Sequence, residues 1–364
     1  MDGLSNLPMN TIAAVILWFG LTCYAILGGV DYGAGFWDLT AGGAKRGARP
    51  RALIDQAITP VWETNNVWLI FALVVLWAAF PRAFASIRST LFVPMALVAA
   101  GIFLHGCALV FHKPIRRFFG ATFALSSLLT PFFLGTTFGA VASGRVEAGD
   151  SGGDALWAWI GPTPLLIGAL AVLCAAFLAA VFLVSEAGRL GDVALERYFR
   201  RRAIGSAVAA GLLAIAGVYV LEHDAPFVFE GLARTGQPFI FFSAAGGVAC
   251  LTLIASGITR GARGLAIGAV VAVLGGWGVA QYPYLLPTSL SIAEGAGAPA
   301  TLRLVLFVSL LVVGTVVPAL AVLFVLDRRG RLEERSQRRA SGVIAGEGHP
   351  PEVAPDWWSH VPSR

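Results

Sequence analysis

Residues 90–111 read TLFVPMALVAAGIFLHGCALVF, and this run decides the fold because it contains no Asp, Glu, Lys or Arg. An α-helix rises about 1.5 Å per residue, so a helix of this length would be about 33 Å long and would cross the ~30 Å hydrocarbon core of a bilayer. The run is continuously apolar and does not alternate every second residue, as a barrel strand would. It therefore predicts a transmembrane helix that satisfies its own backbone hydrogen bonds.

Eight further apolar runs make the chain polytopic. Hydrophobic residues form 57% of the 364 residues and charged residues only 13%, about half the charged share of a soluble protein, which excludes soluble and nucleic-acid-binding classes. We expect an all-α polytopic membrane protein with about nine transmembrane helices in bundles, formed by residues 1–327, and a basic, then Pro/Gly-rich cytoplasmic tail at 328–364. The other runs are approximately 12–39, 62–80, 118–142, 158–187, 203–221, 239–258, 264–281 and 304–326.

The distribution of Lys and Arg predicts the orientation in the membrane. Every second connection between the runs is rich in these residues, and the 26 positive residues divide 21 to 5 between the two sides. Because cytoplasmic loops carry the excess of Lys and Arg, the N-terminus is expected outside and the C-terminus in the cytoplasm. The basic connections at 40–61 and 188–202 are also suited to contact with anionic lipid headgroups.

Charged residues inside a bilayer are costly, so each one is a candidate site. Asp31 lies in the stretch GGVDYGAG at 28–35, where four glycines would allow another helix to approach closely. Such a carboxylate must find a hydrogen-bond donor or stay protonated. Two interpretations stay open at this point: a packing crossover with a capped aspartate, or a role in binding a proton or a ligand.

The second candidate is Glu63, in the stretch TPVWETNNVW at 59–68. Pro60 predicts a helix start, which would place Glu63 in the first turn on the cytoplasmic side. There the carboxylate could collect protons from the cytoplasm and pass them inward. It could equally cap the helix beside interfacial tryptophans, and on the residues alone we favour the cap.

The third candidate is His105, which shares one face of its predicted helix with His112. His105 is the only histidine well inside a predicted span, so it is the only plausible intramembrane haem ligand or proton carrier. Because no second deep histidine or methionine stands opposite, we interpret it by default as a hydrogen-bonded core histidine. The four cysteines lie singly in four different runs, and no metal site is predicted.

Together these stretches resemble subunit II of the cytochrome bd-type quinol oxidases. The helix-1 pattern D-G-F-D-x-G-x-G of that family is matched in part at 28–35, and the aromatic and proline-rich stretch ending in P-[ST]-S is matched at 282–289. The most specific similarity is to the family motif P-x-W-[DE]-x-N-x-x-W-L, which is matched by Pro60, Trp62, Glu63, Asn65, Trp68 and Leu69.

The resemblance implies a subunit of a terminal oxidase in the bacterial cytoplasmic membrane that takes electrons from membrane quinol and reduces dioxygen to water. Haems b and d and the quinol site would belong to the partner subunit I, so this chain would ligate no haem. Glu63 corresponds to the family's acidic residue associated with protons entering from the cytoplasm, with Asp31 on the route or in packing. Trp62, Asn65 and Trp68 would form the neighbourhood of a cofactor. A small single-helix accessory subunit and a structural quinone are also conceivable.

The sequence departs from the family pattern at charged positions. Gly28 replaces the first aspartate of the helix-1 pattern, and the third helix has His105, Val110 and His112 where the family usually has Arg, a carboxylate and Arg. Losing acid and base together is consistent with removal of a buried ion network without an unpaired charge. The rival functions are a purely structural membrane subunit and, less favoured because midplane polar groups are scarce in the later helices, a secondary transporter.

Overall fold

The computed structural model describes residues 8–43, 45–111, 116–149 and 155–328. The chain divides into two compact units, Met1–Phe307 and Val308–Arg364, which are described separately. Of the second unit only the last part of helix α12 is described. In chain order the elements are α1 (Met9–Leu39), α2 (Ala48–Ala79), α3 (Pro81–Thr90), α4 (Phe92–Phe111), α5 (Arg116–Ala142), α6 (Pro162–Arg189), α7 (Val193–Asp224), α8 (Pro226–Arg234), α9 (Gln237–Ala255), α10 (Ala262–Gln281), β1 (Tyr284–Leu286), β2 (Leu290–Ser291), α11 (Ile292–Gly295) and α12 (Pro299–Arg328).

The predicted class, an all-α polytopic membrane protein, is confirmed. Each of the nine predicted runs overlaps one of the long helices, and the two short antiparallel strands form only a small hairpin. By length and composition, seven helices among the described residues qualify as membrane spans, or eight if the bent pair Thr64–Ala79 and Pro81–Thr90 is one span. The described apolar part of α4, Phe92–Ala108, is shorter than that criterion requires, so the number nine stays a prediction.

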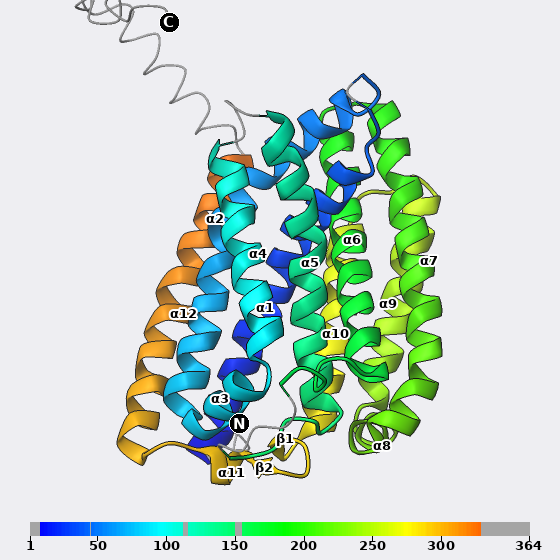
Figure 1. The fold of residues 1–364 in the computed structure, drawn as a ribbon. Coiled ribbons are helices and arrows are strands. Elements are labelled where there is room, and N and C mark those ends of the chain that lie inside the picture. The colour runs from blue at the N-terminus through cyan, green and yellow to red at the C-terminus, as the bar shows by residue number, and fades with distance from the viewer. Residues whose placement is uncertain (1–7, 44, 112–115, 150–154, 329–364) are drawn as a thin grey trace, which may run out of the picture. The chain divides into compact units, whose positions relative to one another are not determined.

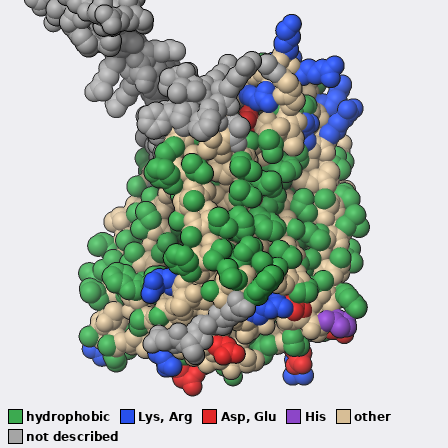
Figure 2. Space-filling view, viewed as in Figure 1, with side chains coloured by type: hydrophobic (Ala, Val, Ile, Leu, Met, Phe, Trp, Pro, Cys, Tyr) green, Lys and Arg blue, Asp and Glu red, His purple; other side chains and the backbone are tan. Residues whose placement is uncertain are grey.

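In the first unit the connections gather at two ends (Figure 1). One end, here called the basic end, carries the connections 40–47 and 190–192. There Arg49, in the first turn of α2, forms an ion pair of 2.6 Å with Asp192 of the second connection. Lys and Arg side chains crowd this end of the molecule (Figure 2). The opposite end carries α3, α8, α11 and the hairpin, and there Arg145 pairs with Asp224 at 2.6 Å. This sorting supports the predicted orientation, which stays a prediction.

Helix α2 begins well before the predicted position. Pro60 does not start a helix, because α2 is continuous over Ala48–Ala79. The twelve residues before Pro60 are helical since Leu53 and Ile54 are almost completely buried in the core and hold this part of the chain against the bundle. Glu63 therefore lies in the helix interior, and the interpretation of Glu63 as a cap in the first turn is wrong.

The centre of the first unit is α1, which packs against α2, α5 and α6. The Trp37 indole N–H donates to the Ala176 carbonyl at 2.8 Å, across the α1–α6 contact. At Gly33 the two helices are so close that an added Cβ would overlap the Ala175 carbonyl oxygen and crowd the Ala179 side chain. Only a glycine fits at this crossing, which fixes the height of α1 in the bundle.

We therefore expect Gly33→Ala to force α1 away from α6 and to lower the stability of the protein by about 1–3 kcal/mol, the usual cost of overpacking. Thermal unfolding of the purified, assembled protein would measure the loss. The matched control is Gly205→Ala on α7, where nothing lies within 4 Å of the added Cβ. A Gly33→Ala midpoint equal to that of the control would contradict the close approach.

Candidate functional site

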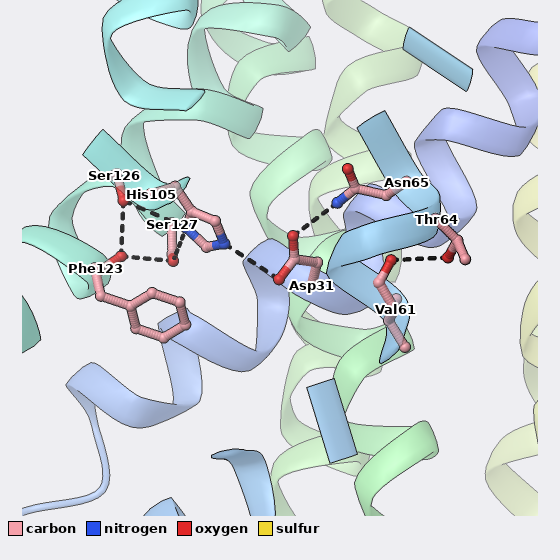
Figure 3. A network of polar contacts seen from close by, with 8 residues as sticks. All are labelled: Asp31, Val61, Thr64, Asn65, His105, Phe123, Ser126 and Ser127. Atoms are coloured by element: carbon pink, nitrogen blue, oxygen red, sulfur yellow. Dashed lines mark hydrogen bonds and ion pairs between the residues drawn. The ribbon is translucent and has the colours of Figure 1, made fainter. Parts of the chain in front are cut away.

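The carboxylate of Asp31 lies completely buried in the bundle, with 0% of its side chain exposed. Three helices bring it together with its partners: α1 carries Asp31, α2 carries Asn65 and α4 carries His105 (Figure 3). Asn65 Nδ2 donates to Asp31 Oδ2 at 2.7 Å, and His105 Nε2 lies 3.1 Å from Asp31 Oδ1. Both carboxylate oxygens thus have a partner, as a carboxylate buried in a membrane requires.

The ring of His105 is held on its other side by α5. Its Nδ1 faces two hydroxyls, Ser127 Oγ at 3.2 Å and Ser126 Oγ at 3.4 Å. Both hydroxyls also donate to the Phe123 carbonyl, at 2.6 and 3.0 Å respectively. The Phe123 ring stacks on the imidazole with 4.7 Å between the ring centroids, and the Tyr32 ring lies 4.7 Å away in a tilted arrangement. The imidazole is therefore fixed in position and orientation.

Glycine makes room for this arrangement as well. An added Cβ at Gly35 would overlap the Ser127 hydroxyl and come close to the Phe123 ring. The same glycine-rich stretch that lets α1 approach α6 therefore also lets α5 bring Ser127 to the histidine. The close helix approach expected at 28–35 is thus what places Asp31 within reach of its hydrogen-bond partners, while a proton or ligand role of Asp31 stays a prediction.

Asp31 and His105 form a buried pair of opposite charge type. Among the described residues, no lysine or arginine contacts either side chain. When the histidine is protonated, the carboxylate and imidazolium neutralise each other, and the interior carries no net charge at this point. Removing one member would leave an uncompensated group in a low-dielectric interior, which is far costlier than the pair itself. The pair is thus a mutually dependent unit.

Two of the residues from the predicted motif neighbourhood are placed by the structure. Asn65 belongs to the Asp31 cluster, and its Oδ1 is buried without a partner among the described residues. Trp68 is also buried, but its ring packs edge-on against Phe19 at 5.6 Å and Phe71 at 6.0 Å. The α2 motif therefore contributes one polar contact to the cluster and one packing contact between α1 and α2.

Other predicted residues lie outside the described set. The side chains of Glu63 and Trp62 are among these, although their backbone belongs to α2, and His112 lies in the undescribed segment 112–115. Within the described residues no group of three His, Cys, Asp or Glu side chains is placed to bind a metal ion. The interpretation of His105 as a hydrogen-bonded core histidine is confirmed by the contacts of both ring nitrogens.

Sequence reasoning missed the partnership of Asp31 with His105 and the two serines of α5. The signal was present, since an acid and a base each stood alone in a predicted span and neither could stay buried without compensation. Nothing in the sequence, however, showed that residues 74 positions apart meet in space. That information lies in the way α1, α4 and α5 pack.

Comparisons with known proteins agree on one family. Residues 9–326 match the family described as cytochrome bd terminal oxidase subunit II. A Bacillus subtilis (strain 168) protein named as a candidate subunit II of a cytochrome bd menaquinol oxidase is 24% identical over 309 residues, which cover 80% of this chain and 88% of the relative. Subunit 2 of the Escherichia coli (strain K12) cytochrome bd-I ubiquinol oxidase is 29% identical over 126 residues, 33% of this chain and 32% of the relative.

The fold is also found in a solved structure. A chain of the bd oxidase from Geobacillus thermodenitrificans superimposes with a TM-score of 0.74 at 24% identity. The superposition covers 87% of this chain and 98% of that chain. At this identity the likeness shows that the two chains share their fold.

The buried pair gives a direct prediction. We expect His105→Leu or Asp31→Leu alone to lower stability by about 3–5 kcal/mol, because each leaves its partner uncompensated. The double variant Asp31→Leu/His105→Leu should lose markedly less stability than the two single variants lose together, since no unpaired group remains. Thermal unfolding of the purified protein completes the double-mutant cycle. Additive losses would show that the two residues do not act as a pair.

Proposed function

Because the chain belongs to the cytochrome bd terminal oxidase subunit II family, we propose that it works in a membrane complex that oxidises quinol and reduces dioxygen to water. The family match over residues 9–326 carries the proposal, since it includes almost all of the apolar helices. The names of the relatives mention both a menaquinol and a ubiquinol oxidase, so the quinone type is left open. The complex would lie in the bacterial cytoplasmic membrane, with the basic end of this chain toward the cytoplasm.

In this complex the partner, subunit I, would carry haems b and d and the quinol site. The contacts of His105 support this division of labour. A haem iron needs a free ring nitrogen, whereas the two nitrogens of this histidine face Asp31 and the serines of α5. This chain would therefore support subunit I and would itself ligate no haem.

We further propose that protons enter this chain from the cytoplasm at Glu63. Val67, Ile70 and Val74 follow Glu63 at helical spacing and are exposed, so this stripe of α2 faces lipid or the partner subunit. Asn65 points from the same helix into the bundle and contacts Asp31. Helix α2 thus carries Glu63 and, two residues later, the Asn65 contact to the buried carboxylate.

Such a route would let the oxidase separate charge without a pump. The protons that reduce dioxygen would be taken up on the cytoplasmic side through this chain, while quinol releases its own protons on the outer side. The net effect is one charge moved across the membrane for each electron, because electrons and protons reach the reaction site from opposite sides.

A purely structural role is the second candidate, and the tight glycine packing of α1 favours it. The crossing at Gly33 and the mutual neutralisation of Asp31 and His105 would suffice to hold subunit I in shape. The two functions differ in whether Glu63 must exchange protons.

The first test is Glu63→Gln in the assembled complex. We expect it to slow oxygen consumption and proton uptake from the cytoplasm by at least about tenfold, since loss of a positioned proton-transfer group typically costs 10²–10⁴-fold. Glu63→Asp, which keeps a carboxylate, should retain most activity. The matched control is Glu294→Gln, which removes a carboxylate from the capping box at the opposite end. Unchanged proton uptake in Glu63→Gln would leave only the structural role.

The second test concerns the haems. In the assembled complex, His105→Gln should leave the positions and intensities of the haem b and haem d absorption bands unchanged for each complex, because both haems are proposed to be ligated by subunit I. A visible absorption spectrum of the purified variant checks this. Loss of one haem band at full subunit stoichiometry would assign a haem to His105 and overturn the division of labour.

A further inference from the structure

His105 stands between two kinds of hydrogen-bond partner with different capacities. On one side Asp31 Oδ1 only accepts, so Nε2 must carry a proton when the carboxylate is ionised. On the other side stand the hydroxyls of Ser126 and Ser127, each with one proton to donate and lone pairs to accept. The protonation state of His105 is therefore coupled to the direction in which these hydroxyls point.

The protons of the His105 ring and the two serine hydroxyls can be arranged in two ways that pair Nδ1, both hydroxyls and the Phe123 carbonyl. Both hydroxyls reach one carbonyl oxygen, that of Phe123, and when both donate to it they offer only lone pairs to His105 Nδ1. In that state Nδ1 must donate, so His105 is an imidazolium. If the imidazole loses this proton, one hydroxyl can turn and donate to Nδ1 while the other keeps the Phe123 carbonyl satisfied. In neither state do His105, the two hydroxyls or the Phe123 carbonyl leave a buried donor or acceptor of their own unpaired.

From this count we propose, resting on the proton route proposed above, that His105 is the proton-holding residue of the bundle. It exchanges one proton at Nδ1, and the hydroxyls of Ser126 and Ser127 switch between accepting and donating. In release, the Nδ1–H bond breaks and an O–H bond forms on a water molecule of the route. In uptake the same bonds change in reverse.

The groups packed against the His105 ring come from α1 and α5. The groups packed around the ring are Asp31 and Tyr32 from α1 and the Phe123 ring with the two serines from α5, while Asn65 of α2 reaches Asp31. Of these groups only Asp31 is a carboxylic acid, and its Oδ1 is the atom that faces Nε2. Release of the proton leaves a single buried negative charge, which is unfavourable. The geometry thus places the group that exchanges a proton directly beside the carboxylate that can balance its charge.

Ser126 and Ser127 make hydrogen bonds beyond those within helix α5. Elsewhere in the chain a buried serine, Ser206, donates only to carbonyls of its own helix, at 2.8 and 3.2 Å. Ser126 and Ser127 donate to their own helix in the same way but also face the histidine. Ser206 is thus a matched control for the backbone role of a buried serine.

The test of the serine switch uses the assembled complex. In Ser126→Ala or Ser127→Ala the remaining hydroxyl can serve either Nδ1 or the Phe123 carbonyl but not both, so each single variant should consume oxygen more slowly than wild type but faster than the double variant. The double variant Ser126→Ala/Ser127→Ala should be slower by at least about tenfold, and so should His105→Arg, which keeps a positive charge beside Asp31 but cannot release its proton. Ser206→Ala should behave as wild type. A double variant as fast as the single variants would overturn the proposal.

A second measurement reads the proton directly and does not depend on turnover. In the complex labelled with ¹⁵N-histidine, solid-state NMR should show the His105 signals, identified by their absence in His105→Gln, in both the imidazolium and the neutral imidazole form over the pH range in which the complex is intact. A histidine that stays in one form over the whole pH range in which the complex is intact would overturn the proposal. Loss of proton uptake in Glu63→Gln beside a non-titrating His105 would reject this inference alone. A titrating His105 beside an unaffected Glu63→Gln would reject the proposed route through Glu63 alone.

Discussion

The first unit is organised around one requirement, which is that the completely buried carboxylate of Asp31 must keep two hydrogen-bond donors. A carboxylate in an apolar interior is tolerated only when it is paired and hydrogen-bonded. Asn65 and His105 supply the donors from α2 and α4. Helices α1, α2 and α4 must therefore meet at one height, and this constraint sets their relative positions along the membrane normal.

Glycine is what allows the helices to meet that constraint. Gly33 lets α1 lie against the backbone of α6, and Gly35 lets the Ser127 hydroxyl of α5 approach α1. In a membrane there is no hydrophobic force that drives apolar helices together, so close van der Waals contact and interhelical hydrogen bonds must supply the attraction. The small residues around Asp31 thus contribute the packing energy that offsets the cost of burying it.

The sequence was sufficient for the class and the approximate helix ranges, because apolar length is a local property that a bilayer selects directly. It was also sufficient to single out Asp31 and His105. It misplaced the start of α2, since Leu53 and Ile54 are buried by tertiary contacts that override the breaking tendency of Pro60. It could not pair Asp31 with His105, because that contact depends on the crossing of helices far apart in the chain.

This geometry explains how the chain can lack the charges that the family pattern implies for the span of α4. The resemblance to the family implies Arg, a carboxylate and Arg at the positions where this chain has His105, Val110 and His112. With Gly28 in place of an aspartate on α1, Asp31 is the acid that α4 must balance, and one base is enough. A histidine meets that need and, unlike an arginine, is a side chain that also exists in a neutral form. Among the described residues this leaves one acid and one base facing each other, and the proposed proton step rests on that pair.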